Sequence, residues 1–192
     1  MYNIKLRPFD YRLDLQGLFA YMLEEGNQKM FSHGFQIHNL AQFEHWITEK
    51  FSKNEFHDFF MIECDNDQTI GFVFSYDFFN YDQHCKYTLC LYEDWRNKGY
   101  GAVVALKMMD YLFKKYPLRQ ILISVFDYNK NSLSCNLKGG FEEVGLIPDY
   151  RFSDGEYHAM HILRITRDKF YEVNQKRLNM IKKREEKENG IL

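Results

Sequence analysis

The sequence predicts a mixed α/β fold, because two kinds of pattern alternate along the chain. Short strand-like runs are interleaved with amphipathic helical stretches over the 192 residues. Three such runs follow one another between residues 57 and 92, and a Gly-x-Gly turn at 99–101 then leads into a helix. Hydrophobic and charged contents of 45% and 27% are typical of a globular domain. A chain of this length can therefore bury one substantial core.

The N-terminal part is expected to form one strand and two helices. Residues 3–8 read as the strand, after which Asp10 caps the first helix and Gly26 ends it. Asn39 begins the second helix in a capping-box arrangement with Gln42. The apolar faces consist of Leu15, Leu18, Phe19, Met22 and Leu23 in the first helix and Leu40, Phe43, Ile47 and Phe51 in the second.

The remaining elements alternate between strands and helices without a linker rich in Pro, Ser or Gly. Pro117 is expected to end the helix that follows the glycine turn, and residues 121–126 read as a fully buried strand. The other expected elements are strands at 57–64, 69–78, 84–92, about 141–147 and 156–166, a short helix from Asn129, and a charged helix from Arg167.

Charge and cysteine usage exclude several classes of protein. The formal net charge of −2 argues against nucleic-acid binding. No apolar run reaches the roughly 18 residues needed to span a bilayer, so no membrane partner is expected. The four cysteines show no C-x-x-C spacing, and the first residues form no apolar signal core, which indicates a cytoplasmic protein. His158 and His161 would face opposite sides of a strand, so no metal site is expected.

The turn between residues 91 and 102 carries the most informative motif. Arg96 precedes Gly99 and Gly101 in the spacing Arg-x-x-Gly-x-Gly, directly before a helix. A helix N-terminus presents unpaired N–H groups and partial positive charge, and glycines let a pyrophosphate approach them. A dinucleotide loop would need a third glycine where the chain has Val104, and a nucleoside-triphosphate loop would need Gly-Lys-Ser/Thr. A simple tight turn is the remaining alternative.

A second motif follows about thirty residues downstream. Asn129 and Ser132 open a short helix that ends in Leu-Lys-Gly-Gly-Phe at residues 137–141. Asn129 or Asn131 could merely cap this helix, and Gly139 could merely end it. A capping role is compatible with contact to a ligand.

These two motifs together resemble the signatures of the GNAT superfamily of N-acetyltransferases. The resemblance covers about residues 2–166 and implies a central, mixed, mostly antiparallel sheet of about seven strands flanked by about four helices, plus a C-terminal helix. It implies a catalytic domain at residues 1–166, followed at 167–192 by a charged helix or tail.

The resemblance also implies acetyl-CoA as co-substrate. Its pyrophosphate would lie over the glycine turn, and its pantetheine arm beside Asn129 and Ser132. In the family, a bulge in the preceding strand offers backbone groups to the pantetheine and the acetyl carbonyl. The residues so implied are Leu89, Leu91, Arg96, Asn97, Lys98, Gly99, Tyr100, Gly101, Ala102, Asn129 and Ser132.

Within the superfamily, the two early helices and the hairpin at 154–158 look most like the ribosomal-protein alanine acetyltransferase branch. Members of that branch often carry an aspartate where this chain has Ala159, which weakens any transfer of their acceptor. In the family the amine enters opposite the CoA, between the early helices and the late hairpin. The acceptor-binding residues expected from this are Phe31, His33, Tyr150 and Tyr157.

Direct attack of an amine on the thioester needs a base, because a free aliphatic amine keeps its proton up to about pH 10. Many relatives place a glutamate where this chain has Cys85, so the nearest titratable candidates for the base are His84, Asp82 and Glu63, of which a histidine suits the task best. The tyrosine that reprotonates the thiolate in relatives falls at Asn136, which cannot donate a titrating proton. Because a thiol has a pKa of only about 8.5, the thiolate can leave without a strong acid.

The sequence thus favours an acetyl-CoA-dependent N-acetyltransferase that acts on a primary amine of a small molecule or on a protein N-terminus. The missing glutamate and tyrosine support one alternative, a non-catalytic acyl-CoA sensor with the same fold. An interaction module without a cofactor would require both motifs to be coincidental. Whether the chain forms a homodimer is left open.

Overall fold

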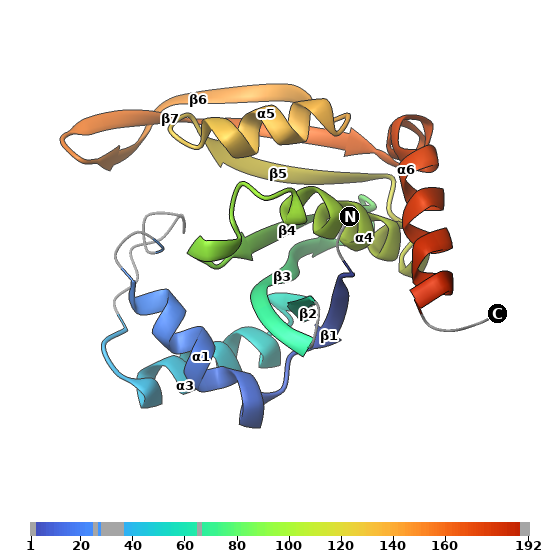
Figure 1. Cartoon of the computed structure of the whole chain (residues 1–192). Helices are drawn as coiled ribbons and strands as arrows, with labels where there is room; N and C mark the ends of the chain where they lie inside the picture. The colour runs from blue at the N-terminus through green and yellow to red at the C-terminus, as the bar shows by residue number, and fades with distance from the viewer. Residues whose placement is uncertain (1–2, 25–26, 28–36, 65–66, 189–192) are drawn as a thin grey trace.

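The computed structural model describes residues 3–24, 27, 37–64 and 67–188, arranged as Figure 1 shows. Among them, seven strands form one sheet in the order β1-β2-β3-β4-β5-β7-β6. The strands are β1 (Lys5–Pro8), β2 (Phe56–Cys64), β3 (Gln68–Phe79), β4 (His84–Leu91), β5 (Gln120–Phe126), β6 (Glu142–Ser153) and β7 (Glu156–Thr166). The helices are α1 (Tyr11–Leu23), α3 (Leu40–Ser52), the short η2 (Glu93–Trp95), α4 (Tyr100–Lys115), α5 (Lys130–Lys138) and α6 (Arg167–Glu188). This architecture confirms the predicted fold class.

Two apolar clusters lie on opposite faces of the sheet. Val73 of β3 is buried in a cluster with α4 and α6, whereas its neighbour Phe72 is buried in a cluster with α1 and α3. Successive strand residues point to opposite sides, so these helices cover different faces. We call them the α4 face and the α1 face.

β4 and β5 form the one parallel pair among the described strands, and their pairing is short. It runs from His84 opposite Gln120 to Lys86 opposite Leu122. Both strands then continue without pairing to each other, through residues 87–91 and 123–126. We call the region bounded by these two segments the open end of the sheet. The β6–β7 hairpin extends past β5 on this side of the molecule (Figure 1).

The predicted capping residues begin the first two helices. Asp10 accepts a hydrogen bond from the Arg12 N–H at the start of α1. Asn39 accepts from the Gln42 N–H at the start of α3, and the Gln42 side chain accepts in return from the His38 N–H. This reciprocal pattern is a close variant of the capping box expected there.

β6 is longer than the strand expected at residues 141–147. Its register with β7 shifts between Ile147 and Arg151, and Asp149 in this interval has a φ of +51°. A bulge leaves a residue outside the ladder, which accommodates Pro148 because proline has no N–H to donate. The strand therefore continues past a proline at which the sequence pattern ended it.

The charged helix α6 is integrated into the core of the α4 face. Phe170 is fully buried against Phe113 of α4, and Leu178 and Ile181 are buried in the same cluster. The buried Asn174 donates from Nδ2 to the carbonyl oxygen of Gly139 (2.9 Å). None of the helices in the described part of the chain combines the length and apolarity needed to cross a bilayer.

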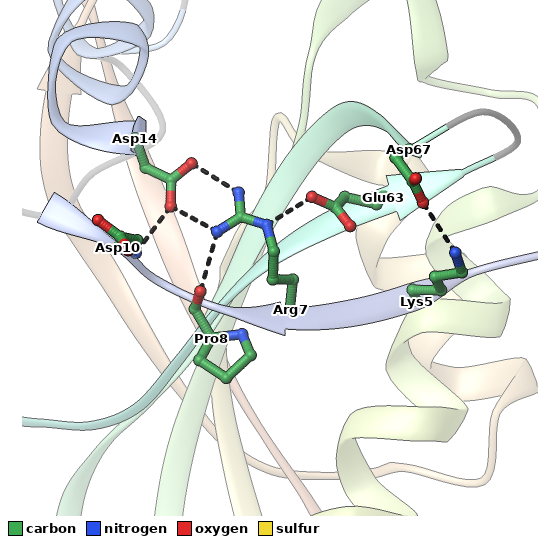
Figure 2. Close-up of polar contacts among 7 residues, drawn as sticks. All are labelled: Lys5, Arg7, Pro8, Asp10, Asp14, Glu63 and Asp67. Atoms are coloured by element: carbon green, nitrogen blue, oxygen red, sulfur yellow. Dashed lines mark hydrogen bonds and ion pairs between the residues drawn. The ribbon is translucent and has the colours of Figure 1, made fainter. Parts of the chain in front are cut away.

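A buried ion network fixes the N-terminal end of α1 to the sheet, as Figure 2 shows. The Arg7 guanidinium of β1 makes two hydrogen bonds to the Asp14 carboxylate of α1 (2.7 and 2.9 Å) and a third to Glu63 of β2 (2.5 Å). Asp14 and Glu63 are both buried. Asp14 also accepts from the Asp10 N–H, so one carboxylate serves the helix terminus and the guanidinium. One cation thus holds two buried carboxylates and joins three elements.

Replacing Arg7 with Met should therefore destabilise the protein strongly. Two buried carboxylates would face each other without a cation, and breaking a buried pair in this way typically costs about 3–5 kcal/mol. The matched control is Lys5→Met, which removes the exposed Lys5–Asp67 pair (side chains 59% and 71% exposed) and should leave the free energy of unfolding almost unchanged. Urea unfolding at pH 7 measures both. Equal, small losses would show that the network does not fix α1.

Candidate functional site

At the open end, the backbone groups of Leu89 and Leu91 in β4 point away from β3, toward the side of the sheet on which β5 lies. The Tyr92 N–H donates to the Ile70 carbonyl oxygen, which makes this a hydrogen-bonded pair between β4 and β3. Bonded and non-bonded pairs alternate along an antiparallel ladder, so Leu89 and Leu91 direct their N–H and C=O groups away from β3. β5 does not pair with this part of β4. From the sequence we expected backbone contacts to the pantetheine at this edge of β4. Because β4 and β5 separate here, the edge is not paired with another strand.

The bulge implied by the family resemblance is not where it was expected. β4 keeps one register with β3 from Lys86 to Leu91, and the irregularity lies instead between Tyr76 and Phe79 of β3. Asp77, at that irregularity, has a φ of +48°. Strand separation, and not a bulge, presents the Leu89 and Leu91 backbone in this chain.

The glycine turn after β4 leaves the N-terminus of α4 without a side-chain cap. Asn97 and Gly99 have φ angles of +59° and +88°, and Gly99 is the N-cap residue of α4. The N–H groups of the first turn, which includes Tyr100, Gly101 and Ala102, therefore point out of the helix end. The buried Tyr100 ring packs edge-on against Trp95 (5.2 Å between centroids), and Lys98 Nζ lies 5.8 Å from the same indole. The packing of Tyr100 on Trp95 thus supports a helix N-terminus of the kind that binds anions.

The Arg96 side chain is directed toward α1. Its Nε donates to the Leu91 carbonyl oxygen (2.8 Å), and a terminal nitrogen donates to the Tyr21 hydroxyl (3.1 Å) and to Asn27 Oδ1 (2.6 Å). Asn27 is buried and also bonds to the Tyr21 carbonyl oxygen. Arg96 therefore ties the glycine turn to the C-terminal end of α1. Its contact with the pyrophosphate stays a prediction.

The second motif lies beside the first. Asn129 caps α5 by accepting from the Ser132 N–H (3.3 Å). Asn131 donates from its amide to the side-chain oxygen of Asn97, which joins the start of α5 to the glycine turn. The structure thus brings the two predicted cofactor motifs together at the open end of the sheet.

The two candidate catalytic residues, His84 and Asn136, lie in different surroundings. Asn136 donates from Nδ2 to the carbonyl oxygen and the hydroxyl of Ser132 (2.8 and 3.2 Å), one turn earlier in α5. His84 stacks on Phe79 at the opposite end of β4 (4.8 Å between centroids). At about 3.3 Å per strand residue, this is some 23 Å from Leu91. The structure therefore does not bring His84 to the open end.

Cys85, at the position where relatives place the base, is fully buried on β4. Burial raises the pKa of its thiol to about 12, with the carboxylate of Asp58 adding to the shift. The thiol consequently stays protonated at neutral pH. Cys85 cannot take over the role of the missing glutamate.

The predicted acceptor residues lie partly outside the described residues. Phe31 and His33 fall in the undescribed range 28–36. Tyr150 and Tyr157 lie on the β6–β7 hairpin with 46% and 65% of their surfaces exposed. Tyr157 packs against Phe152, the residue opposite it in the hairpin.

Sequence reasoning missed a histidine–carboxylate pair at the end of β5. The Nδ1 of His158 lies 3.0 Å from Asp127 Oδ1, and Tyr128 packs edge-on against the imidazole (4.9 Å between centroids). The second histidine of the motif, His161, pairs with Glu143 instead. From the sequence, the His-x-x-His spacing was considered only as a possible metal site. The contact with Asp127 depends on how β5 pairs with β7, which the sequence does not show.

A side chain at position 101 should weaken acetyl-CoA binding without disturbing the fold. A Cβ there would meet the Leu91 side chain at 3.7 Å, an ordinary contact, so Gly101→Val should fold while filling the approach to the helix N-terminus. We expect its acetyl-CoA Kd to rise at least about tenfold, or about 1.4 kcal/mol.

Isothermal titration calorimetry, together with the thermal shift caused by ligand, measures this loss. Gly17→Val on α1 is the control, because nothing lies within 4 Å of a Cβ there. Unchanged binding by Gly101→Val would place the pyrophosphate elsewhere.

Comparison with known proteins agrees with this geometry. A family model described as an acetyltransferase (GNAT) domain matches residues 3–142. The chain is 26% identical over 125 residues to the SPbeta prophage-derived uncharacterized N-acetyltransferase YokL of Bacillus subtilis (strain 168), which covers 65% of this chain and 70% of that protein.

Solved structures resemble the chain in fold. Spermidine N-acetyltransferase from Vibrio cholerae in complex with CoA and spermine matches 87% of this chain and 97% of its own, with a TM-score of 0.79 and 18% identity. A dodecameric structure of that enzyme in an intermediate state matches 87% and 95%, with a TM-score of 0.75 and 19% identity. With its family model covering most of the sheet and the glycine turn, the chain belongs to the GNAT acetyltransferases, enzymes that take the acetyl group from acetyl-CoA.

Proposed function

We propose that this protein transfers the acetyl group of acetyl-CoA directly to a primary amine of a small cationic molecule or of a protein N-terminus. One observation carries the proposal: the uncapped α4 N-terminus, the start of α5 and the free edge of β4 meet where β4 and β5 separate. The residues proposed to hold acetyl-CoA are those of the two motifs. Their N–H groups would bind the pyrophosphate and the pantetheine, so positioning supplies much of the rate enhancement.

The exposed hairpin supports a cationic acceptor. Core residues are seldom as exposed as Tyr150, Phe152 and Tyr157, at 46%, 63% and 65%. Aromatic rings beside carboxylates such as Asp154 attract an ammonium group through cation–π and charge interactions. The V. cholerae relatives are spermidine enzymes by name, and the alanine acetyltransferase resemblance of the sequence suggests a protein N-terminus instead. Both acceptors present a primary amine. The proposal does not specify whether the protein acts as a homodimer.

An acceptor screen tests the proposed reaction. Purified protein and acetyl-CoA are incubated with spermidine, spermine and a peptide with N-terminal alanine, while free thiol release and acetylated product are measured. We expect thiol release that depends on one of these amines and matches the product in amount. Binding of acetyl-CoA without transfer to any amine would favour the non-catalytic sensor.

Alanine at Tyr150 or Tyr157 should raise the KM of the acceptor by about 2–5-fold, which corresponds to one exposed cation–π contact of about 0.5–1 kcal/mol. The acetyl-CoA affinity should not change. Tyr81→Ala is the control, since Tyr81 is fully exposed in the β3–β4 turn. Loss of acetyl-CoA affinity in the hairpin variants would exclude a role limited to the acceptor.

Asn136→Ala should change kcat by less than about tenfold. The amide bonds within α5 and cannot donate a titrating proton, and one lost hydrogen bond is worth about 1 kcal/mol. Steady-state kinetics with the best acceptor measure the effect, with the exposed Ser134→Ala on α5 as control. A loss of several orders of magnitude would contradict solvent as the source of the thiol proton.

A further inference from the structure

β7 carries two histidine–carboxylate pairs of matching geometry. His158 Nδ1 lies 3.0 Å from Asp127 Oδ1, and His161 Nδ1 lies 3.0 Å from Glu143 Oε2. Each imidazole is 17% exposed. Because the histidines are three apart on one strand, they face opposite sides of the sheet. The two pairs therefore have similar hydrogen-bond distances and exposure but lie on different faces of the sheet.

His158 lies on the α1 face, at the open end. Leu163 and Ile165 of β7 are buried on the α4 face, so the odd-numbered residues of β7, including His161, belong to that face. His158 therefore faces the other side. Asp127 directly follows the last residue of β5 and pairs with Ala159 through its backbone N–H (3.0 Å). This is the face from which the amine would enter, opposite the CoA.

Asp127 holds the imidazole in a defined tautomer. Its Oδ2 accepts from the Ala159 N–H (3.0 Å), so the carboxylate is fixed at the end of the β5–β7 ladder. That backbone hydrogen bond, followed by the His158 contact, lowers the pKa of Asp127. An ionised carboxylate only accepts hydrogen bonds, so the proton of a neutral His158 lies on Nδ1. Nε2 is then free to accept a proton, and the edge-on Tyr128 ring restricts rotation of the imidazole.

The strands that border the open end offer few other bases on this face. On β4 the residues of this face are His84, remote from the opening, Lys86, paired with Asp77 (3.0 Å), Thr88 and Cys90. Burial raises the pKa of the Cys90 thiol to about 12. On β5 they are Gln120, Leu122, Ser124 and Phe126. Among the described residues, the charged and titratable groups next to His158 are Asp127 from the end of β5, Tyr128, which packs on the imidazole, and Arg151 of β6, opposite it in the hairpin.

We propose that His158, oriented by Asp127, is the base that takes the proton from the acceptor's ammonium group. This assignment rests on the proposed function. His158 Nε2 accepts one proton from R–NH3+, and the neutral amine nitrogen forms a bond to the carbonyl carbon of the thioester. The C–S bond breaks, with its electron pair leaving on sulfur. The thiolate takes a proton from solvent, and solvent accepts the second N–H proton of the amine and, afterwards, the proton of the imidazolium. Ammonium and thioester thus give amide, thiol and one released proton.

The test compares His158→Gln with the matched variant His161→Gln, using the amine of the acceptor panel that the wild type acetylates fastest. Gln keeps a donor for the carboxylate in both variants and removes the titrating group. The pH dependence of kcat/KM is measured between pH 5.5 and 9, since histidine changes its charge in the lower part of this range. We expect His158→Gln to lose about 100-fold in kcat near pH 7, as for loss of general-base catalysis. The acidic limb of its profile should disappear.

Further readouts separate a base from a structural residue. His158→Gln should keep the wild-type acetyl-CoA Kd and melting temperature, His161→Gln should keep wild-type kcat, and added imidazole should partly restore His158→Ala. Asp127→Asn, which removes the orienting charge, should lower kcat by a smaller factor than His158→Gln.

The outcomes distinguish this assignment from the proposed function. Wild-type kcat in His158→Gln, or equal losses in the two glutamine variants, would overturn the role of His158 and leave the acetyltransferase intact. An unchanged acidic limb would do the same. A wild type that acetylates no amine would overturn the proposed function and this assignment with it.

Discussion

The short parallel contact between β4 and β5 is the constraint on which the rest of the site depends. Parallel strands end at the same edge of a sheet, so the turns that follow β4 and β5 begin side by side. Because pairing stops after Lys86 and Leu122, the Leu89 and Leu91 backbone has no ladder partner in β5. Two helix N-termini and a free strand edge are thereby directed to one place. A fully paired sheet would use those backbone groups in its own ladder and leave none for the acetyl-CoA that we propose binds here.

Two arginines determine how the α1 side meets this edge. Arg7 binds the first turn of α1 to β1 and β2 through buried carboxylates, and Arg96 binds its last turn to the glycine turn. Asn27, just beyond α1, shares the Arg96 guanidinium. The helix is therefore held at both ends by bidentate or forked contacts that only the guanidinium group provides. A displacement of α1 would act directly on the glycine turn through Arg96, and so would couple the proposed acceptor side of the sheet to the proposed cofactor side.

The sequence predicted those features whose cause is local. The caps at Asp10, Asn39 and Asn129 and the glycine turn each follow from a few adjacent residues. Features that depend on register were not predictable in this way. Arg96 meets Tyr21 across 75 positions, and His158 meets Asp127 across 31, so their residue types gave no signal of the contact. For the same reason His84 was favoured by its nearness in sequence to Cys85, although it lies at the end of β4 that is remote from the opening.

The two groups that this chain lacks are not equally important for the chemistry. A thiolate is an acceptable leaving group, because the pKa of its thiol is near 8.5. Asn136 in place of a tyrosine therefore removes a proton donor that the reaction does not strictly need. An aliphatic ammonium with a pKa near 10 is inert until it loses a proton, so a base cannot be dispensed with. That base needs only to lie on the face that we propose for the acceptor, beside the opening, with a lone pair available at neutral pH. The buried Cys85 thiol fails this requirement through its raised pKa. A residue of β7, two strands away from β4 in the sheet, can meet this requirement equally well. Alternate side chains of β4, β5 and β7 lie on the same face of the sheet.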